Sequence, residues 1–234
     1  MSGVIDKVPD VSALVGEENI LIGHRICPFV QRVAIVFDEL SMPYKKVDID
    51  LDRKPDWLKK YSPALKVPIL LVGGEASIFE SAIICEYLDS GTNKLFSMSS
   101  LKRAQEKSWI SYSASILDVI AKIIYKSKDD VEIRRDSDDL REKILVVEKD
   151  LNEWPYFNKD FSMVDIMYAP IFRYFDFFKR FLGVDFYGGN EKLEAWSSHV
   201  LARPSVMNCV SKSYDKEFKE FILGKNKYLY KKLN

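Results

Sequence analysis

Residues 19–33 of the chain read NILIGHRICPFVQRV, and the change of pattern within them decides the fold of the first part of the molecule. Asn19–Gly23 is a short apolar run that ends in glycine, which is typical of a buried strand. From Phe29 onward the apolar side chains recur at helical spacing, and Pro28 suits the first helical turn, where its missing N–H costs nothing. Cys27 is therefore predicted to lie between a strand and a helix, at the helix N-terminus.

The residues that follow predict the rest of a compact α/β unit. An alternating run, an apolar run and a returning run after a Gly-Gly turn indicate three further strands. The expected strands are Tyr44–Ile49, Val67–Val72 and Ala76–Ile78, and the expected helices are Asp52–Tyr61, short and partly irregular, and Glu80–Leu88. Strand–helix–strand followed by hairpin–helix predicts one α/β domain over residues 19–89.

The second half has a different character. Ser90–Ser100 is polar and contains glycine, which indicates a linker. Beyond it, helical spacing without a convincing strand predicts an all-α domain over residues 101–222. The expected helices are Leu101–Lys126, Ser137–Leu151, Met163–Leu182, Glu191–Ala202 and Ser205–Phe221. Ser162 and Asp165 have the spacing of a capping box, so we expect them to start the third helix and to have no other role.

The composition limits the classes of function. Lysine plus arginine and aspartate plus glutamate both number 35, so the net charge is zero and nothing attracts the whole chain to nucleic acid or to an anionic membrane. Three cysteines and two histidines without ligand spacing predict neither a disulfide framework nor a metal site. The pattern of a signal peptide is missing, and so is the run of about 20 apolar residues that a membrane helix needs. We therefore expect a soluble, cytoplasmic protein.

The Cys27 thiol is the strongest candidate for chemistry. The unpaired N–H groups and the dipole of the helix that begins there favour the thiolate, and Arg25 and Arg32 add positive charge, so we expect a lowered thiol pKa and a nucleophilic sulfur. The alternative is a buried structural cysteine, which is the commonest fate of a free cysteine. Because Val30 stands where a C-x-x-C pair has its second cysteine, a mixed disulfide with an external thiol is favoured over an internal disulfide.

Two further elements are weak signals when each is taken singly. Pro68 lies between a loop and a strand, where proline is usually an edge or turn residue. Glu80 and Ser81 begin a helix, and such residues are more often caps, although the N–H groups at a helix start can also hold a carboxylate.

Together, these elements resemble one protein family. Cys-Pro-Phe-x-Gln-Arg from Cys27, Lys-Val-Pro-Ile-Leu from Lys66 and Phe-Glu-Ser-Ala-Ile-Ile-Cys-Glu-Tyr-Leu from Phe79 are similar to the thioredoxin-like domain of the glutathione transferases. The cysteine-type loop and the KPDW sequence of Lys54–Trp57 are most similar to the omega class and related cysteine-type glutathione transferases. The resemblance is dense over residues 19–89, and it implies the glutathione transferase fold, an α/β N-terminal thioredoxin-like domain followed by an all-α C-terminal domain.

The resemblance also implies a glutathione site. The implied residues are Cys27 at the glutathione sulfur, Phe29 along the wall, Val67 ahead of a cis-Pro68 at the cysteinyl backbone, Glu80 and Ser81 at the γ-glutamyl end, and Lys54 at the glycine carboxylate. A helix start, an acid and a lysine are the groups that complement the two carboxylates and the ammonium of glutathione. For Lys54 alone, a solvated surface lysine is an equally good interpretation.

The activity that the resemblance implies is glutathione-dependent thiol transfer or reduction, similar to that of a dehydroascorbate reductase. Other classes of the family activate glutathione with a tyrosine or serine hydroxyl, whereas Cys27 stands at the matching position here. The implied cosubstrate is glutathione, with no metal, and the implied partners are a small hydrophobic or disulfide acceptor and a second copy of the chain in a homodimer. Two alternatives stay open, a non-catalytic binding or regulatory module on the same fold and ordinary conjugation of glutathione to electrophiles.

The remaining distinctive residues are expected to be structural. Cys85 and Cys209 are predicted to be small core residues, and the aromatic cluster between Tyr168 and Phe178 is predicted to be core rather than pocket. For Lys225–Lys232, a solvated basic tail is favoured over a lid.

Overall fold

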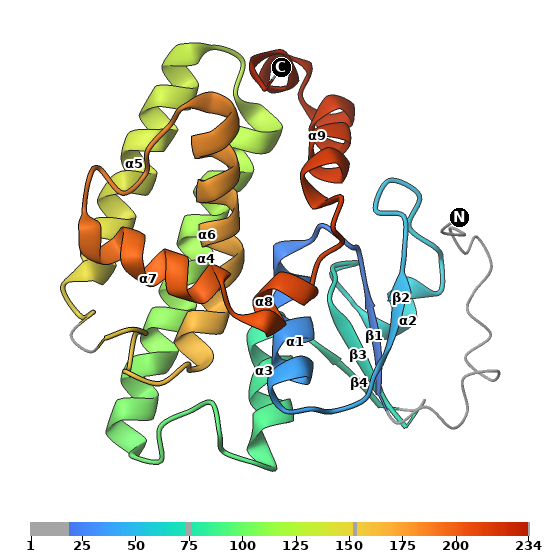
Figure 1. Cartoon of the computed structure of the whole chain (residues 1–234). Helices are drawn as coiled ribbons and strands as arrows, with labels where there is room; N and C mark the ends of the chain where they lie inside the picture. The colour runs from blue at the N-terminus through green and yellow to red at the C-terminus, as the bar shows by residue number, and fades with distance from the viewer. Residues whose placement is uncertain (1–18, 74–75, 152–153, 234) are drawn as a thin grey trace. The chain divides into compact units, whose positions relative to one another are not determined.

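The computed structural model describes residues 19–73, 76–151 and 154–233, and these residues form two compact units (Figure 1). The first, which we call the α/β unit, consists of residues 19–94 together with Asn208–Val210. The second, which we call the helical unit, consists of Leu95–Met207 and the residues from Ser211 onward. Each unit is described by itself.

A four-stranded sheet forms the centre of the α/β unit. Its strands are β1 (Asn19–Gly23), β2 (Lys45–Asp48), β3 (Ile69–Val72) and β4 (Ala76–Phe79), in the spatial order β2-β1-β3-β4. β1 runs parallel to β2 and antiparallel to β3, and β3 runs antiparallel to β4. The expected strands are thus present, and the predicted glutathione transferase fold class is confirmed for this unit.

Helices cover both faces of this sheet. α1 (Pro28–Glu39) and α3 (Ser81–Ser90) pack against each other on one face, and α2 (Leu58–Tyr61) lies on the other (Figure 1). Alternate strand residues point to opposite faces, so Ile20 and Ile22 enter the core cluster beside Leu58, which is fully buried. Pro28 begins α1 as expected.

Gly23 at the end of β1 fixes how closely α1 approaches the sheet. A Cβ atom on Gly23 would clash with both Cγ atoms of Val30 in the first turn of α1. The backbone of the strand and the side chain of the helix therefore touch only because residue 23 has no side chain.

The helical unit consists of a bundle around one buried apolar helix. Its elements are α4 (Ser100–Lys126), α5 (Asp130–Glu148), α6 (Met163–Leu182), α7 (Glu191–Leu201), α9 (Tyr214–Lys225) and α10 (Lys227–Lys232), and α8 (Pro204–Asn208) spans the boundary between the units. α4 packs against α5 and α6, and α6 packs against α7. The aromatic cluster of α6 is buried, so its prediction as core is confirmed.

The predicted capping box begins α6. Asp165 is fully buried, and its carboxylate accepts hydrogen bonds from the Ser162 backbone N–H (2.8 Å) and the Ser162 hydroxyl (2.7 Å). The same carboxylate accepts the Phe157 N–H (2.9 Å) and the Trp196 indole N–H (2.7 Å). It therefore ties the loop before α6 to α7 as well as starting the helix.

Several predicted boundaries of the helical unit were wrong. α5 begins at Asp130 and not at Ser137, because Asp129 caps it by accepting the Glu132 N–H at 2.8 Å and the charged first turns lie on its solvent side. The segment expected as one helix, Ser205–Phe221, is interrupted between α8 and α9. In the α/β unit, the helix expected over residues 52–61 keeps only its last turn as α2.

The C-terminal segment was also predicted wrongly as a solvated tail. Residues 227–232 form α10, whose Leu229 is fully buried. Asp130 accepts hydrogen bonds from the Tyr228 hydroxyl and the Lys232 ammonium, each at 2.8 Å, and so fixes α10 to the start of α5. Of the helices that the structure describes, none has the length and apolar character needed to cross a membrane.

Candidate functional site

The strand register brings four chain segments to one edge of the sheet. Gly23, the last residue of β1, lies beside Asp48, the last residue of β2, because these two strands are parallel. Ile69 begins β3 opposite Ile22 and also pairs with Phe79 at the end of β4. The residues that follow β1, β2 and β4 and those that precede β3 therefore leave the sheet at the same edge.

The residues predicted for the glutathione site belong to these four segments. Cys27 follows β1, Val67 and Pro68 precede β3, and Glu80 and Ser81 follow β4. These segments meet at one edge because of the order and direction of the strands. Local sequence patterns predict each strand but not how the strands are arranged. The fourth segment, which follows β2, carries Lys54.

Cys27 is the N-cap of α1. Its carbonyl oxygen accepts the N–H groups of Val30 and Gln31, both at 3.1 Å, while its side chain makes no capping hydrogen bond. The loop before it is held by the Cys27 N–H, which donates to the His24 carbonyl at 2.9 Å, and by the Gln31 amide, which donates to the Ile26 carbonyl at 3.3 Å. Backbone hydrogen bonds therefore form this helix start. Cys27 as a whole residue is partly exposed, whereas its sulfur lies on the buried side of the residue.

The electrostatics of Cys27 differ from the sequence-based expectation. Burial raises the pKa of the thiol above its ordinary value, because a low-dielectric environment disfavours the thiolate. The N–H groups of Val30 and Phe29 and the charges of Arg32 and Lys46 lower the pKa, as expected for a helix start, but their sum is smaller than the effect of burial. The predicted net lowering of the pKa is therefore wrong for the ligand-free protein.

Arg32 and Phe29 form the wall of α1 next to the thiol. Arg32 is only 2% exposed, and its guanidinium lies 5.2 Å from the centroid of the Phe29 ring. Phe29 itself is partly exposed. Sequence reasoning counted Arg32 only as a nearby charge, and its burial is visible only once the helix is packed.

The peptide bond between Val67 and Pro68 is cis, as the resemblance implied. Pro68 is buried, and Val67 is partly exposed. Because the ladder of β3 begins at Ile69, the backbone of Val67 lies outside it, beside the end of β1.

The start of α3 has an unusual backbone. Glu80 is its N-cap with φ of 69° and ψ of 115°, a region that residues with a side chain rarely occupy, and its side chain makes no capping hydrogen bond. Ser81, the first helical residue, is 6% exposed, whereas Glu80 is exposed. Non-glycine residues in such conformations cluster at functional sites, where the strain is maintained by the surrounding structure.

Lys54 lies on the exposed segment between β2 and α2. The Asp50 carboxylate orders the start of this segment by accepting the N–H groups of Asp52 (2.8 Å) and Arg53 (3.3 Å) and the Arg53 guanidinium (3.1 Å). Within the described residues, no hydrogen bond or ion pair joins Lys54 to another candidate residue. The structure therefore places Lys54 on the segment that leaves the sheet after β2 and does not fix its ammonium group.

The other two cysteines differ from each other. Cys85 is fully buried in α3, as predicted, and burial raises the pKa of its thiol to about 12. Cys209 is partly exposed, so its prediction as a core residue is wrong; it lies in the interruption between α8 and α9. Among the residues that the structure describes, no group of histidine, cysteine, aspartate and glutamate side chains could hold a metal ion.

Residues 21–94 match the family model described as glutathione S-transferase, N-terminal domain. Glutathione S-transferase L1 of Arabidopsis thaliana is 31% identical over 200 residues, which is 82% of this chain and 81% of the relative. Glutathione S-transferase omega-2 of Rattus norvegicus is 30% identical over 194 residues, which is 78% of this chain and 74% of the relative. The chain belongs to the glutathione S-transferase family.

Another relative is similar over a shorter stretch at a higher identity. Pyrimidodiazepine synthase of Drosophila melanogaster is 38% identical over 103 residues, and this alignment spans 42% of each chain. Solved structures support the glutathione S-transferase fold over most of the chain. Omega 3C from Trametes versicolor (TM-score 0.75, 20% identity) aligns with 86% of this chain and 93% of its own. A rice glutathione S-transferase in complex with glutathione (TM-score 0.79, 22% identity) aligns with 91% of this chain and 98% of its own.

Proposed function

We propose that this glutathione S-transferase is of the cysteine type and catalyses glutathione-dependent thiol transfer or reduction through a mixed disulfide between Cys27 and glutathione. The observation that supports it most is the single sheet edge at which a partly exposed cysteine, a cis-proline segment and an uncapped helix start converge. Relatives named omega-class transferases support the same assignment.

In this proposal, glutathione lies along that edge. Its sulfur meets Cys27, its cysteinyl backbone pairs with the backbone of Val67, and its γ-glutamyl carboxylate binds the N–H groups at the start of α3 beside Ser81. The uncapped N-terminus of α3 favours an anion, because its N–H groups have no side-chain acceptor from the N-cap residue. Glu80 faces the ammonium of the γ-glutamyl group, which accounts for an acidic residue at a position with positive φ.

The remaining groups act at the other end and along the wall. Phe29 covers the glutathione backbone, and Lys54 reaches the glycine carboxylate from its exposed segment. Pro68 is buried behind Val67 and holds the segment before β3 in place. Glutathione is thus the cosubstrate, and the proposed chemistry uses no metal.

The reaction proceeds in two disulfide exchanges. The Cys27 thiolate attacks the glutathione sulfur of a glutathionylated acceptor, the acceptor leaves as a thiolate that takes up a proton, and Cys27 remains bonded to glutathione. A second glutathione thiolate then attacks the glutathione sulfur of this mixed disulfide, which releases oxidised glutathione and restores the Cys27 thiolate. The acceptor is a small hydrophobic or disulfide compound. A dehydroascorbate-like or quinone-like acceptor has no disulfide to exchange, so it instead takes two electrons and two protons from the Cys27 thiol and one glutathione, which leaves the reduced acceptor and the same Cys27–glutathione mixed disulfide.

The raised pKa of Cys27 favours one rival, in which the fold serves as a glutathione-binding or regulatory module without turnover. A protonated thiol in the ligand-free protein is a poor nucleophile. In the enzymatic proposal, the uncapped helix start and the nearby cations must therefore keep enough thiolate for reaction at neutral pH. The two functions differ in whether a disulfide is turned over, so one experiment separates them.

The deciding experiment is mixed-disulfide formation with oxidised glutathione, followed by intact mass measurement and a glutathione-coupled disulfide reduction assay. The variants are Cys27→Ala and, as a matched control that removes the thiol of another partly exposed cysteine, Cys209→Ala. We expect one adduct and turnover in the wild type and in the control, and neither in Cys27→Ala. An adduct without turnover supports the binding module, and an adduct that persists in Cys27→Ala refutes the assignment of the nucleophile.

We also propose a homodimer and a cytoplasmic location. Phe79, Ile83 and Tyr87 are 43%, 54% and 43% exposed, and the last two share one face of α3, which leaves an apolar surface on the α/β unit for a second copy. We expect light scattering after size exclusion to give twice the chain mass for the wild type and the monomer mass for Ile83→Glu. A free reactive thiol is compatible with a reducing compartment.

A further inference from the structure

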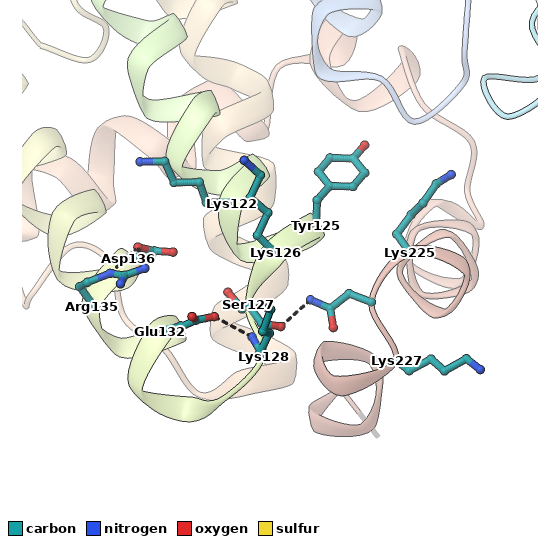
Figure 2. A pocket seen from close by; sticks show the side chains of 11 residues that line it. Lys122, Tyr125, Lys126, Ser127, Lys128, Glu132, Arg135, Asp136, Lys225 and Lys227 are labelled. Carbon is teal, nitrogen blue, oxygen red and sulfur yellow. Dashed lines mark hydrogen bonds and ion pairs between the residues drawn. The ribbon is translucent and has the colours of Figure 1, made fainter.

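The helical unit contains a hollow that the proposed reaction does not use. It lies where α4 ends, beside the first turns of α5 and the junction of α9 with α10, and has a volume of about 610 Å³ (Figure 2). We call it the basic hollow. The residues that line it belong to the segments 122–128, 132–136 and 225–227. Its volume is in the range of sites for small ligands.

The charges that line the basic hollow are strongly unequal. Six of the lining side chains are cationic and two are acidic. One acidic group is neutralised locally, because the Asp136 carboxylate lies 3.0 Å from the Arg135 guanidinium. The other, Glu132, accepts the backbone N–H of Lys128 at 2.9 Å. Five lysines therefore accompany one carboxylate whose acceptor capacity is already partly used, although the chain as a whole is neutral.

The lysines at the end of α4 repel one another in the absence of an anion. Lys122 and Lys126 are four residues apart, so they share one helix face, where like charges destabilise a helix. Within the described part of the chain, no carboxylate is within ion-pair distance of Lys122, Lys126 or Lys128. The helix dipole accounts for a cation in the last turn, but not for three lysines together. In Figure 2 the ammonium groups of Lys122 and Lys126 extend on the same side of α4, whereas Lys227 points away from them.

The lining of the basic hollow includes a buried hydroxyl group. Ser127 is only 3% exposed, and its hydroxyl has no hydrogen-bond partner among the described residues. Its carbonyl accepts the Asn226 amide N–H at 2.9 Å, which holds the α9–α10 junction against the end of α4. A buried hydroxyl without a partner is unusual. Rotation of the Ser127 side chain toward the hollow would give this hydroxyl a ligand oxygen as an acceptor.

From these observations we infer that the basic hollow binds a small polyanion that bears two or more phosphate groups. Lysine ammonium groups are point charges on flexible stems, so several of them can surround a compact cluster of phosphate oxygens. A single carboxylate is matched better by the planar fork of an arginine guanidinium. Tyr125, which is 49% exposed beside Lys126, offers a ring to a base or other aromatic group on such a ligand. Two sources share this chemistry, free polyphosphate and a nucleoside polyphosphate.

The test is calorimetric titration of the full chain with tripolyphosphate and with ATP at low salt. The variant Lys122→Ala/Lys126→Ala removes two cations of the hollow, and Lys102→Ala/Lys107→Ala removes two lysines from the other end of the same helix as a control with equal net charge. We expect saturable binding with one ligand per chain, about tenfold weaker in the first variant and within about twofold of wild type in the second. The affinity of the wild type should also fall steeply as the salt concentration rises.

Two outcomes would overturn the inference: no saturable binding to either probe, or binding that both double variants weaken equally, which would indicate a diffuse charge effect. The comparison between the probes identifies the source. Equal affinity for ATP and tripolyphosphate assigns the site to phosphates alone, and tighter binding of ATP that Tyr125→Ala removes assigns it to a nucleotide. Disulfide turnover should be unchanged in both double variants, so the result is independent of the proposed function.

Discussion

The helices of the two units begin in different ways. In the helical unit, α4, α5, α6, α7 and α10 have side chains that satisfy the N–H groups of the first turn or complete a capping box, with Ser99, Asp129, Ser162, Asn190 and Asn226 as the capping residues. In the α/β unit, none of α1, α2 and α3 has a capping hydrogen bond from its N-cap side chain. In the helical unit, α9 also lacks a capping hydrogen bond from its N-cap side chain.

This difference distinguishes helix starts that are satisfied within the protein from helix starts that can bind a ligand. A capped start is complete within the protein, whereas the starts of α1 and α3 keep N–H groups that can bind an anionic partner. The residues at these two starts, Cys27 and Glu80, are those that the proposed glutathione site uses.

Replacing Cys27 should remove activity without removing stability. We expect kcat/KM for glutathione-coupled disulfide reduction to fall at least about a thousandfold in Cys27→Ser, because the thiol is the reacting atom and a hydroxyl of similar size cannot form the mixed disulfide. The free energy of unfolding in urea should change by less than about 1 kcal/mol, since the side chain makes no capping hydrogen bond. A large loss of stability would mean that Cys27 is a structural cap after all.

Asp165 should show the opposite behaviour. In Asp165→Ala the Phe157, Ser162 and Trp196 N–H groups lose their acceptor in the core, and we expect about 3–4 kcal/mol of lost unfolding free energy. Urea denaturation followed by tryptophan fluorescence measures this loss. At temperatures where the variant is folded, kcat/KM should be within about threefold of wild type. A loss below 1 kcal/mol would show that this capping box is dispensable.

Cys27 and Asp165 also show which features the sequence could predict and which it could not. Cys27 before Pro28 and the spacing of Ser162 and Asp165 are local signals, and both predicted their helix starts correctly. Two of the four hydrogen-bond donors to the Asp165 carboxylate were not predictable, because Phe157 and Trp196 reach it only through packing of separate elements.

The incorrect predictions also arise because local sequence patterns do not include the packing of separate elements. A lowered pKa of the Cys27 thiol follows from the helix dipole alone, whereas the structure adds the larger effect of burial, which acts in the opposite direction. The helix expected over Ser205–Phe221 has suitable spacing throughout, whereas the structure interrupts it between Asn208 and Tyr214. Gly23 was visible as the end of a strand, but its close contact with Val30 was not.

The contact at Gly23 gives a third prediction. Gly23→Ala places a Cβ atom against both Cγ atoms of Val30, and the required shift of α1 should cost about 1–3 kcal/mol of unfolding free energy. Gly91→Ala is the matched control, because nothing lies within 4 Å of a Cβ atom there and its φ is −78°. Since α1 carries the proposed nucleophile, Gly23→Ala should also slow mixed-disulfide formation, and the control should not. Equal stability of the two variants would contradict the prediction.

The thiols themselves give a fourth prediction. Because burial raises the pKa of Cys27, its alkylation rate in the ligand-free protein should still rise with pH beyond about 8.5, the ordinary thiol value. Lys46→Ala removes a charge that lowers this pKa, so its rate profile should move to higher pH. Cys85, with a pKa of about 12, should not react in the folded protein. Peptide mass spectrometry after timed alkylation distinguishes the sites, and a plateau of the Cys27 rate below pH 8 would contradict this account.

The smallest expected effect concerns Lys54, whose exposed ammonium is the least fixed of the candidate groups. If it binds the glycine carboxylate of glutathione, Lys54→Ala should raise the KM for glutathione about threefold to tenfold with kcat within about twofold, because an exposed charge pair contributes little. Lys59→Ala is the matched control, since its ammonium lies 3.9 Å from Asp56 on the same segment. The rise in KM should shrink as salt increases. Identical KM values in both variants would make Lys54 a solvated surface lysine and would restrict the proposed site to the backbone groups and helix starts at the sheet edge.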